Sequence, residues 1–379
     1  MLLFALTVTA LIGAIVFVVA IGLVVQKISY RIRTTRKAEL DDQYLQKLSP
    51  LLLEEFSPDA LDPDSLAFRQ NCKRIFEPLR AELGSHGILS RRAHRAALKR
   101  VALEMSNELV GETRVRLTQA FQICGFVQDE MHDLKSRRWW IRAKACRNLA
   151  LMRAEDATAD FVILLSDEQE DVRTEAAMAL MSISGVTALR PLLTNLHSIS
   201  VWMSIQLSRV VLSMGSRAVP DLIYGLRAGQ KSVTSFCAEM LGAIGDIAAC
   251  EPLVDCARTG DLAVRSTSMI AIGKLGDARG KAVLLDGLSD EEEQSRVSAA
   301  QGLGYLASPE TARQLKDHLL HDTIAVRLAA GKSLKRIEGV GGEMLVTAHR
   351  EADTIGKRVI LQFLEELGIQ EDTLDGISV

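Results

Sequence analysis

The strongest constraint on this chain is a repeat of about 31 residues in its C-terminal two thirds. Segments that open with an anchor pair, most often an apolar residue followed by arginine, recur at steps of 31, 30, 31, 31, 31 and 31 residues: Ile141-Arg142, Val172-Arg173, Trp202-Met203, Val233-Thr234, Val264-Arg265, Ser295-Arg296 and Val326-Arg327. A fixed period of this length is typical of stacked units, each of which buries its apolar face only against its neighbours. The repeat therefore predicts a stack rather than one globular core.

Each unit carries the pattern of a helix pair. The residue eight after the anchor is apolar in all seven units, the residue eleven after it is apolar in six, and small residues mostly stand four and five after it. These offsets share one face of an α-helix. A turn containing Gly or Asp follows, and then a second short apolar segment, often with proline in its first turn, as in "ALRPLL" and "AVPDLI". The pattern predicts an all-α solenoid of two antiparallel helices per unit.

The segments "DVRTEAAMALMSISG", "LAVRSTSMIAIGKLGD" and "IAVRLAAGKSLKRIEG" resemble HEAT-like repeats of the phycobilisome-lyase type, over residues 136–340. The resemblance implies an α-solenoid of about seven helix pairs, and it is specific for the fold rather than for a function. HEAT-repeat hydroxylases hold iron with His-Glu pairs, and none of the seven histidines here is followed by Glu. The resemblance therefore does not extend to that activity, and nothing local supports bilin attachment.

An uncharged apolar run, Leu2 to Val25, precedes the repeats. Its 24 residues exceed the roughly 20 that a helix needs to cross a bilayer. No basic residue precedes the run, and five follow it: Lys27, Arg31, Arg33, Arg36 and Lys37. This distribution favours an uncleaved transmembrane helix with its N-terminus outside and the rest of the chain in the cytoplasm.

These features predict five segments. They are a transmembrane anchor (1–26), a basic juxtamembrane and helical spacer (27–89), N-terminal capping helices (90–135), HEAT-like repeats (136–342) and a C-terminal cap and tail (343–379). We expect the amphipathic part of the spacer to dock on the membrane or on a partner.

The arginine after the anchor forms the most regular array of candidate binding residues: Arg142, Arg173, Arg265, Arg296 and Arg327. A ladder of this kind meets phosphates or an acidic partner if it faces solvent. The alternative is structural, with each arginine paired to an acid in a nearby turn, such as Asp171, Asp290 or Asp322. We favour the structural interpretation, because a repeat fold repeats its own internal contacts.

The stretch "SRRWWIRAKAC" at the start of the first repeat gives further candidate residues: Arg137, Arg138, Trp139 and Trp140. Large aromatic side chains bury much area at once, so we expect the tryptophan pair to seal the preceding helices against the first repeat. Two alternatives are contact with a partner, since Trp and Arg dominate binding hot spots, and contact with a membrane surface.

The sequence predicts no catalytic, cofactor or metal site. Its cysteines, which show no CxxC pairing, read as buried apolar residues: Cys72, Cys124, Cys146, Cys237, Cys250 and Cys256. Fragments that imitate nucleotide-binding motifs, "GKS" at 331–333 and "GLGYLA" at 302–307, fall inside repeat helices. The net charge of −3 argues against a surface tuned to nucleic acid.

We therefore expect a non-enzymatic, membrane-anchored scaffold that binds a partner protein. The layout, with "LKSRRWW" opening the first repeat, resembles bacterial HEAT-repeat membrane proteins associated with family-2 glycosyltransferases of polysaccharide synthesis. This resemblance implies a place in the bacterial inner membrane and a membrane-embedded glycosyltransferase as partner. The alternatives are a receptor for an anionic ligand or lipid surface that uses the arginine ladder, and an enzyme or cofactor-binding protein that uses the concave face.

Overall fold

A computed structural model describes residues 27, 34–54, 56, 62–63, 65–85, 87–227 and 230–370. Every regular element within these ranges is a helix, which confirms the predicted all-α class. The chain divides into two compact units, Met1–Ala157 and Thr158–Val379. The predicted anchor lies outside the described residues, as do Arg31 and Arg33 of its flank, whereas Lys27, Arg36 and Lys37 are described and exposed.

The first unit contains six α-helices among its described residues: residues 34–53, α2 (Leu66–Ser85), α3 (Ile88–Met105), α4 (Gly111–Ile123), α5 (Phe126–Asp133) and α6 (Trp139–Leu151). In the first of these, Tyr44, Leu48 and Leu52 stand four residues apart and are buried. The Arg100 guanidinium of α3 also forms an ion pair with Asp41. The amphipathic part of the predicted spacer therefore packs its apolar face within the first unit.

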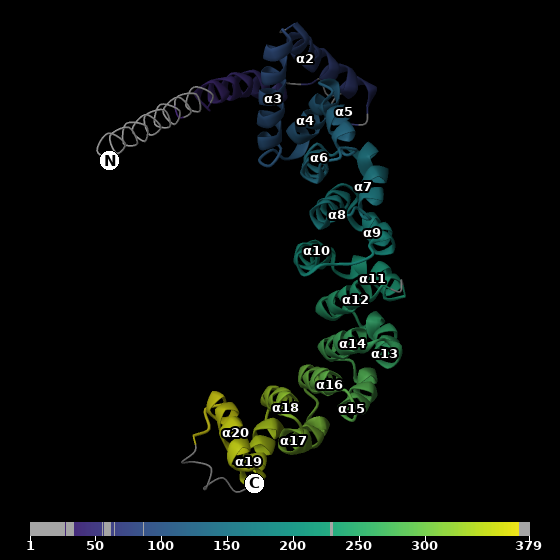
Figure 1. The fold of residues 1–379 in the computed structure, drawn as a ribbon, viewed down its shortest axis with the longest axis vertical. Coiled ribbons are helices and arrows are strands. Elements are labelled where there is room, and N and C mark those ends of the chain that lie inside the picture. Colours follow the sequence, from purple (N-terminus) through teal and green to yellow (C-terminus); the bar gives the residue numbers. More distant parts are fainter. Residues whose placement is uncertain are drawn as a thin grey trace, which may run out of the picture. The chain divides into compact units, whose positions relative to one another are not determined.

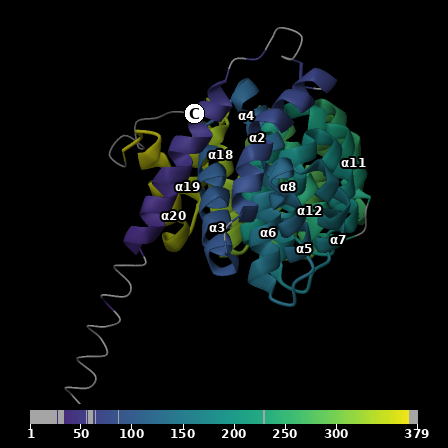
Figure 2. The ribbon, with the colours of Figure 1, turned by 90° about the horizontal axis from the view of Figure 1, so that it is seen from above.

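The second unit is a stack of helices in two rows (Figure 1). The outer row contains α7 (Thr158–Leu164), α9 (Leu189–Asn195), α11 (Val219–Leu226), α13 (Cys250–Thr259), α15 (Lys281–Leu288), α17 (Ala312–His321) and α19 (Val340–Glu351). The inner row contains α8 (Glu170–Ser184), α10 (Val201–Met214), α12 (Lys231–Ile244), α14 (Leu262–Leu275), α16 (Glu293–Leu306), α18 (Ile324–Arg336) and α20 (Thr354–Glu366). Seen from above, α7 and α11 again lie to one side of α8 and α12 (Figure 2).

Small residues set the packing of the inner row from α12 to α18. A Cβ atom added to Gly273 of α14 would lie 2.2 Å from the Gly302 carbonyl oxygen of α16, so the two helix backbones are in contact. Gly242 and Gly304, at the same repeat position, approach the next helix in the same way. The equivalent positions of α8 and α10 hold Met181 and Leu212, whose bulk prevents this contact. The inner row is thus closely packed only from α12 to α18.

The structure corrects the repeat register at α10. Met203 is fully buried whereas Trp202 is exposed, so Met203 is the anchor and its step from Val172 is 31 residues. The prediction that Trp202 is the anchor is wrong. Both residues are apolar, and a helix turns by about 100° per residue, so only one of two neighbours can face the core.

One described segment, the 26 residues Glu170–Asn195, is long and apolar enough to cross a membrane by length and composition. It consists of α8, a 3₁₀ turn and α9, and half of its most apolar stretch is buried inside the unit. Val172, Ala176 and Leu180 of α8 are among its buried residues. The segment therefore has the burial of a core element of the stack.

Candidate functional site

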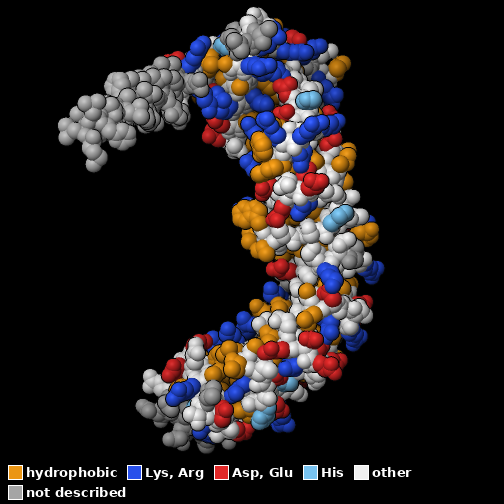
Figure 3. Space-filling model, viewed as in Figure 1, with side chains coloured by type: hydrophobic (Ala, Val, Ile, Leu, Met, Phe, Trp, Pro, Cys, Tyr) orange, Lys and Arg blue, Asp and Glu red, His pale blue; other side chains and the backbone are white. Residues whose placement is uncertain are grey.

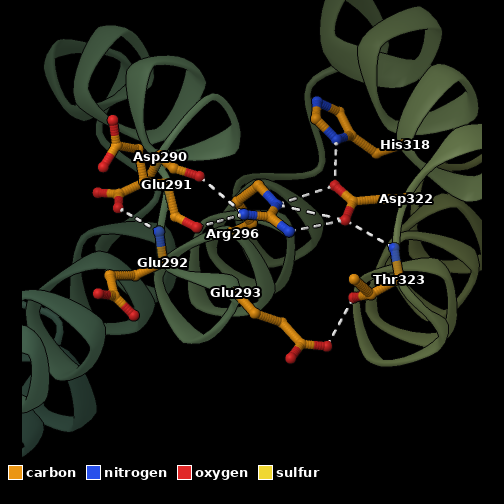
Figure 4. A network of polar contacts seen from close by, with 8 residues as sticks. All are labelled: Asp290, Glu291, Glu292, Glu293, Arg296, His318, Asp322 and Thr323. Carbon is orange, nitrogen blue, oxygen red and sulfur yellow. Dashed lines mark hydrogen bonds and ion pairs between the residues drawn. The ribbon is translucent and has the colours of Figure 1, made fainter.

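The arginine that recurs in the repeats holds the turns between helices. In α16, Nη1 of Arg296 donates to the carbonyl oxygens of Asp290 at 2.8 Å and Glu291 at 2.9 Å. Its Nε and Nη2 donate to the two carboxylate oxygens of Asp322, each at 3.0 Å (Figure 4). Nδ1 of His318 lies 2.9 Å from the same carboxylate. One guanidinium thus joins the turn before its own helix to the turn before the next inner helix.

The other ladder arginines make related contacts. Arg173 donates to the Asp167 carbonyl at 2.8 Å, and Arg327 donates to the Leu319 carbonyl at 2.9 Å. Arg265 pairs with the Asp290 carboxylate, and in the first unit Arg142 donates to the Ser136 carbonyl at 2.9 Å. These contacts support the structural interpretation of the ladder. Binding of an anion by the ladder stays a prediction.

The pKa of Asp322 reports how strongly this contact favours the ionised carboxylate. Burial by itself raises the pKa, but hydrogen bonds from Arg296, from His318 and from the Thr323 N–H outweigh burial and hold the pKa at about 2. The ordinary value is 3.8. Because the folded pKa lies below the unfolded pKa, the contact stabilises the fold fully above about pH 4 and is lost as the pH falls toward 2.

We predict that Arg296→Gln lowers the free energy of unfolding at pH 7 by about 1–3 kcal/mol, the usual contribution of hydrogen bonds to a charged group. The difference in the free energy of unfolding between the variant and the parent protein should become smaller as the pH falls from about 4 to about 2, because protonated Asp322 no longer forms an ion pair with the guanidinium. Thermal unfolding at a series of pH values measures both effects. The matched control is Arg313→Gln, which removes the same charge from an exposed position of α17. A loss that does not vary with pH would contradict the assignment.

All three tryptophans of the chain are exposed. Trp139 and Trp140 at the start of α6 are 37% and 53% exposed, and Trp202 at the start of α10 is 58% exposed. In the corrected register, Trp140 and Trp202 both stand directly before an anchor. Because large aromatic side chains normally bury most of their area, three exposed tryptophans mark surfaces suited to contact.

The tryptophan pair does not seal the junction inside the first unit, so that prediction is wrong. The two rings pack edge to face with centroids 6.0 Å apart, and the Arg138 guanidinium lies 5.8 Å from the Trp140 ring centroid. Arg137 and Arg138 are exposed beside the rings. Helix α6 packs against α5 and buries a different set of side chains: Ala145, Cys146 and Leu149.

A second exposed surface lies on α10 of the second unit. Four apolar side chains are exposed along this helix: Val201, Trp202, Ile205 and Leu212. Figure 3 shows hydrophobic side chains gathered over α10 on the inner side of the second unit. We call these four residues the α10 stripe. It covers about 16 Å along the helix axis at 1.5 Å per residue.

The α10 stripe was not predicted from the sequence, although the sequence of this helix is apolar on more than one face. The helix also buries Met203, Leu207 and Val211, so it is apolar on two faces. A helix with apolar residues nearly all round is expected to be buried on all sides. Only one face of α10 is covered within the second unit, and the other face is exposed.

The described residues contain no group of three or more His, Cys, Asp or Glu side chains placed to hold a metal ion. All six cysteines are free thiols, and all except Cys256 are buried. Burial raises the pKa of the Cys124 thiol to about 11. The five buried cysteines are therefore packing residues, as predicted, whereas Cys256 is partly exposed.

The sequence pattern of HEAT repeats matches residues 131–203 and 219–296. No curated protein sequence matches the chain. Among solved structures, the complex of CpcE and CpcF of phycocyanin lyase from Nostoc sp. is 18% identical, with 66% of this chain and 91% of that chain covered and a TM-score of 0.31. Human deoxyhypusine hydroxylase is 16% identical, with 85% and 96% covered and a TM-score of 0.28. Kap95p in its complex with RanGDP is 11% identical, with 84% and 56% covered and a TM-score of 0.45.

Proposed function

Because this chain is a HEAT-like repeat protein, we propose that it is a non-enzymatic scaffold that binds a partner protein through its exposed tryptophan surfaces. The observation that carries the proposal is the exposure of all three tryptophans, at the starts of α6 and α10. Tryptophan and arginine are the residues most enriched in the hot spots of protein interfaces. A stack of repeats also offers a long surface, which suits protein binding more than small-molecule chemistry.

The α10 stripe indicates how the partner binds. Its apolar residues follow one helix for three turns, with the Arg209 guanidinium as the exposed charge among them. A surface of this kind suits an amphipathic helix that lays its apolar face along α10 and places an acid opposite Arg209. The Trp139–Trp140 pair, with Arg137 and Arg138, provides a second contact in the first unit.

We further propose that the scaffold is anchored in the bacterial inner membrane by residues 1–26, with its N-terminus outside. The uncharged run and the basic residues after it support this proposal. The partner would be a membrane-embedded glycosyltransferase of polysaccharide synthesis, as the layout around "LKSRRWW" suggests. Anchoring both proteins in one membrane raises their effective concentration without any new contact.

Affinity purification from detergent-solubilised membranes tests the proposal. We predict that the parent chain recovers a protein partner, and that the double variant Trp202→Ala/Ile205→Ala weakens its capture about tenfold or more, as expected for a hot spot. The matched control is Ile163→Ala/Ile247→Ala, which removes two exposed apolar side chains outside the α10 stripe and should leave capture unchanged.

Two outcomes would contradict the scaffold function. One is that the parent chain recovers only itself in mild detergent. The other is that the Trp202→Ala/Ile205→Ala variant captures as much partner as the control variant.

A further inference from the structure

The first unit contains a groove between α2 and α4 that the proposed scaffold function does not use. It has a volume of about 540 Å³, within the range of small-molecule sites. Its lining comes from α2, α4 and the start of α5: Arg69, Lys73, Glu77, Arg80, Gln119, Gln122, Ile123, Gly125 and Gln128. Charged and amide side chains dominate this lining, so the groove suits a polar ligand.

The charges in the groove favour an anion. Three cations of α2, namely Arg69, Lys73 and Arg80, face one acid, Glu77. Arg80 lies 3.6 Å from the Glu77 carboxylate. Arg69 and Lys73 are exposed, and neither side chain makes a hydrogen bond or an ion pair with any residue that the structure describes. Two cations are therefore available for a ligand, and guanidinium and ammonium groups bind phosphate oxygens well.

Neutral donors complete the groove. Gln119, Gln122 and Gln128 each present a side-chain amide. Gly125, whose φ of 73° lies in the left-handed region, is the N-cap residue of α5, and no side chain caps the first N–H groups of this helix. Uncapped N–H groups at a helix N-terminus attract negative charge. They add to the field of Arg69 and Lys73.

Glu77 favours a ligand that carries a hydroxyl group as well as an anionic group. Its side chain is 45% exposed, and its carboxylate lines the groove beside Arg80. A carboxylate accepts a hydrogen bond from a hydroxyl group, whereas it repels a bare anion.

We propose that this groove binds a small phosphate ester that carries free hydroxyl groups. The phosphate contacts Arg69 and Lys73, and a hydroxyl donates to Glu77. The proposal is independent of the scaffold function, since it involves neither α6 nor α10.

Isothermal titration of the full chain in a nonionic detergent tests the site, with glucose 1-phosphate as the probe. Binding should be saturable, inorganic phosphate should bind more weakly, and glucose should not bind. Arg69→Gln/Lys73→Gln should weaken glucose 1-phosphate binding about tenfold or more, because each removes a charge-assisted hydrogen bond. The matched control, Arg92→Gln/Lys135→Gln, removes the same charge from exposed positions outside the groove and should leave the Kd unchanged.

Glu77→Gln separates a built site from a basic patch. Loss of its negative charge should tighten inorganic phosphate binding while the preference for glucose 1-phosphate over phosphate falls. Dioctanoyl phosphatidylglycerol, titrated in the same way, distinguishes the two sources of the ligand. If it binds in dependence on Arg69 and Lys73 while glucose 1-phosphate does not, the ester is a lipid headgroup.

Either of two results would refute the site. One is that no phosphorylated probe binds saturably. The other is that the control variant loses as much affinity for glucose 1-phosphate as the Arg69→Gln/Lys73→Gln variant. Circular dichroism melting of each variant shows whether a lost affinity reflects unfolding.

Discussion

Glu130→Ala is expected to lower the free energy of unfolding of the first unit by about 3 kcal/mol, because it breaks a buried charge pair. Glu130 lies on α5 and is 2% exposed. Its Oε1 accepts from the Lys99 ammonium of α3 at 2.6 Å and from the buried Asn148 amide of α6 at 3.0 Å. Removing the carboxylate leaves both donors without this acceptor and separates the three helices that it joins.

The control for this prediction is Glu130→Gln, which keeps an oxygen acceptor for Lys99 or Asn148. We expect about half the loss of the alanine variant, because neutral hydrogen bonds are roughly half as strong as charge-assisted ones. Urea unfolding followed by tryptophan fluorescence in a Trp202→Phe background reports on Trp139 and Trp140, and therefore on the first unit alone. Equal losses in the two Glu130 variants would show that the charge contributes nothing.

Gly273→Ala is expected to lower the free energy of unfolding of the second unit by about 2–3 kcal/mol, the usual cost of overfilling a packed interior. The added Cβ would lie 2.2 Å from the Gly302 carbonyl oxygen and 2.5 Å from its Cα. These are backbone atoms, so no side chain can rotate away. Helices α14 and α16 must move apart, and the close packing on either side of them is lost.

Gly342→Ala is the matched control in the same unit. Gly342 lies inside α19, and the nearest atom to an added Cβ is Cδ1 of Leu367 at 4.0 Å. Alanine should stabilise the protein here, by up to about 1 kcal/mol, since it favours the helix over the unfolded chain. Scanning calorimetry of both variants measures the contrast. A similar decrease in the two variants would mean that the helix spacing does not depend on Gly273.

The periodic residues predicted the helix pairs well. Leu180, Leu241, Ile272 and Leu303, each eight residues after its predicted anchor, are all buried in inner-row helices. The predicted C-terminal cap after residue 342 contains α20 and most of α19, although α19 begins at Val340. These features were predictable because an amphipathic helix must bury its apolar stripe wherever the neighbouring unit lies.

The candidate site was harder to predict. The sequence pointed to Trp139 and Trp140 as buried residues, yet both are exposed, because α6 buries Ala145, Cys146 and Leu149 instead. The adjacent apolar residues Trp202 and Met203 look equivalent in sequence. Which of them faces the core depends on the rotation of α10 about its axis, and packing against the neighbouring helices sets that rotation.

The amino-acid sequence by itself determined the all-α class, the helix pairs and the arginines that hold their turns, since these follow from residues close together in the chain. Tertiary structure decided which faces stay uncovered, and it brought Arg69 of α2 and Gln119 of α4 to one groove across 50 residues of chain. The physical reason is that short-range periodicity specifies a helix and its apolar stripe. The spacing and rotation of packed helices depend on contacts between residues far apart in sequence.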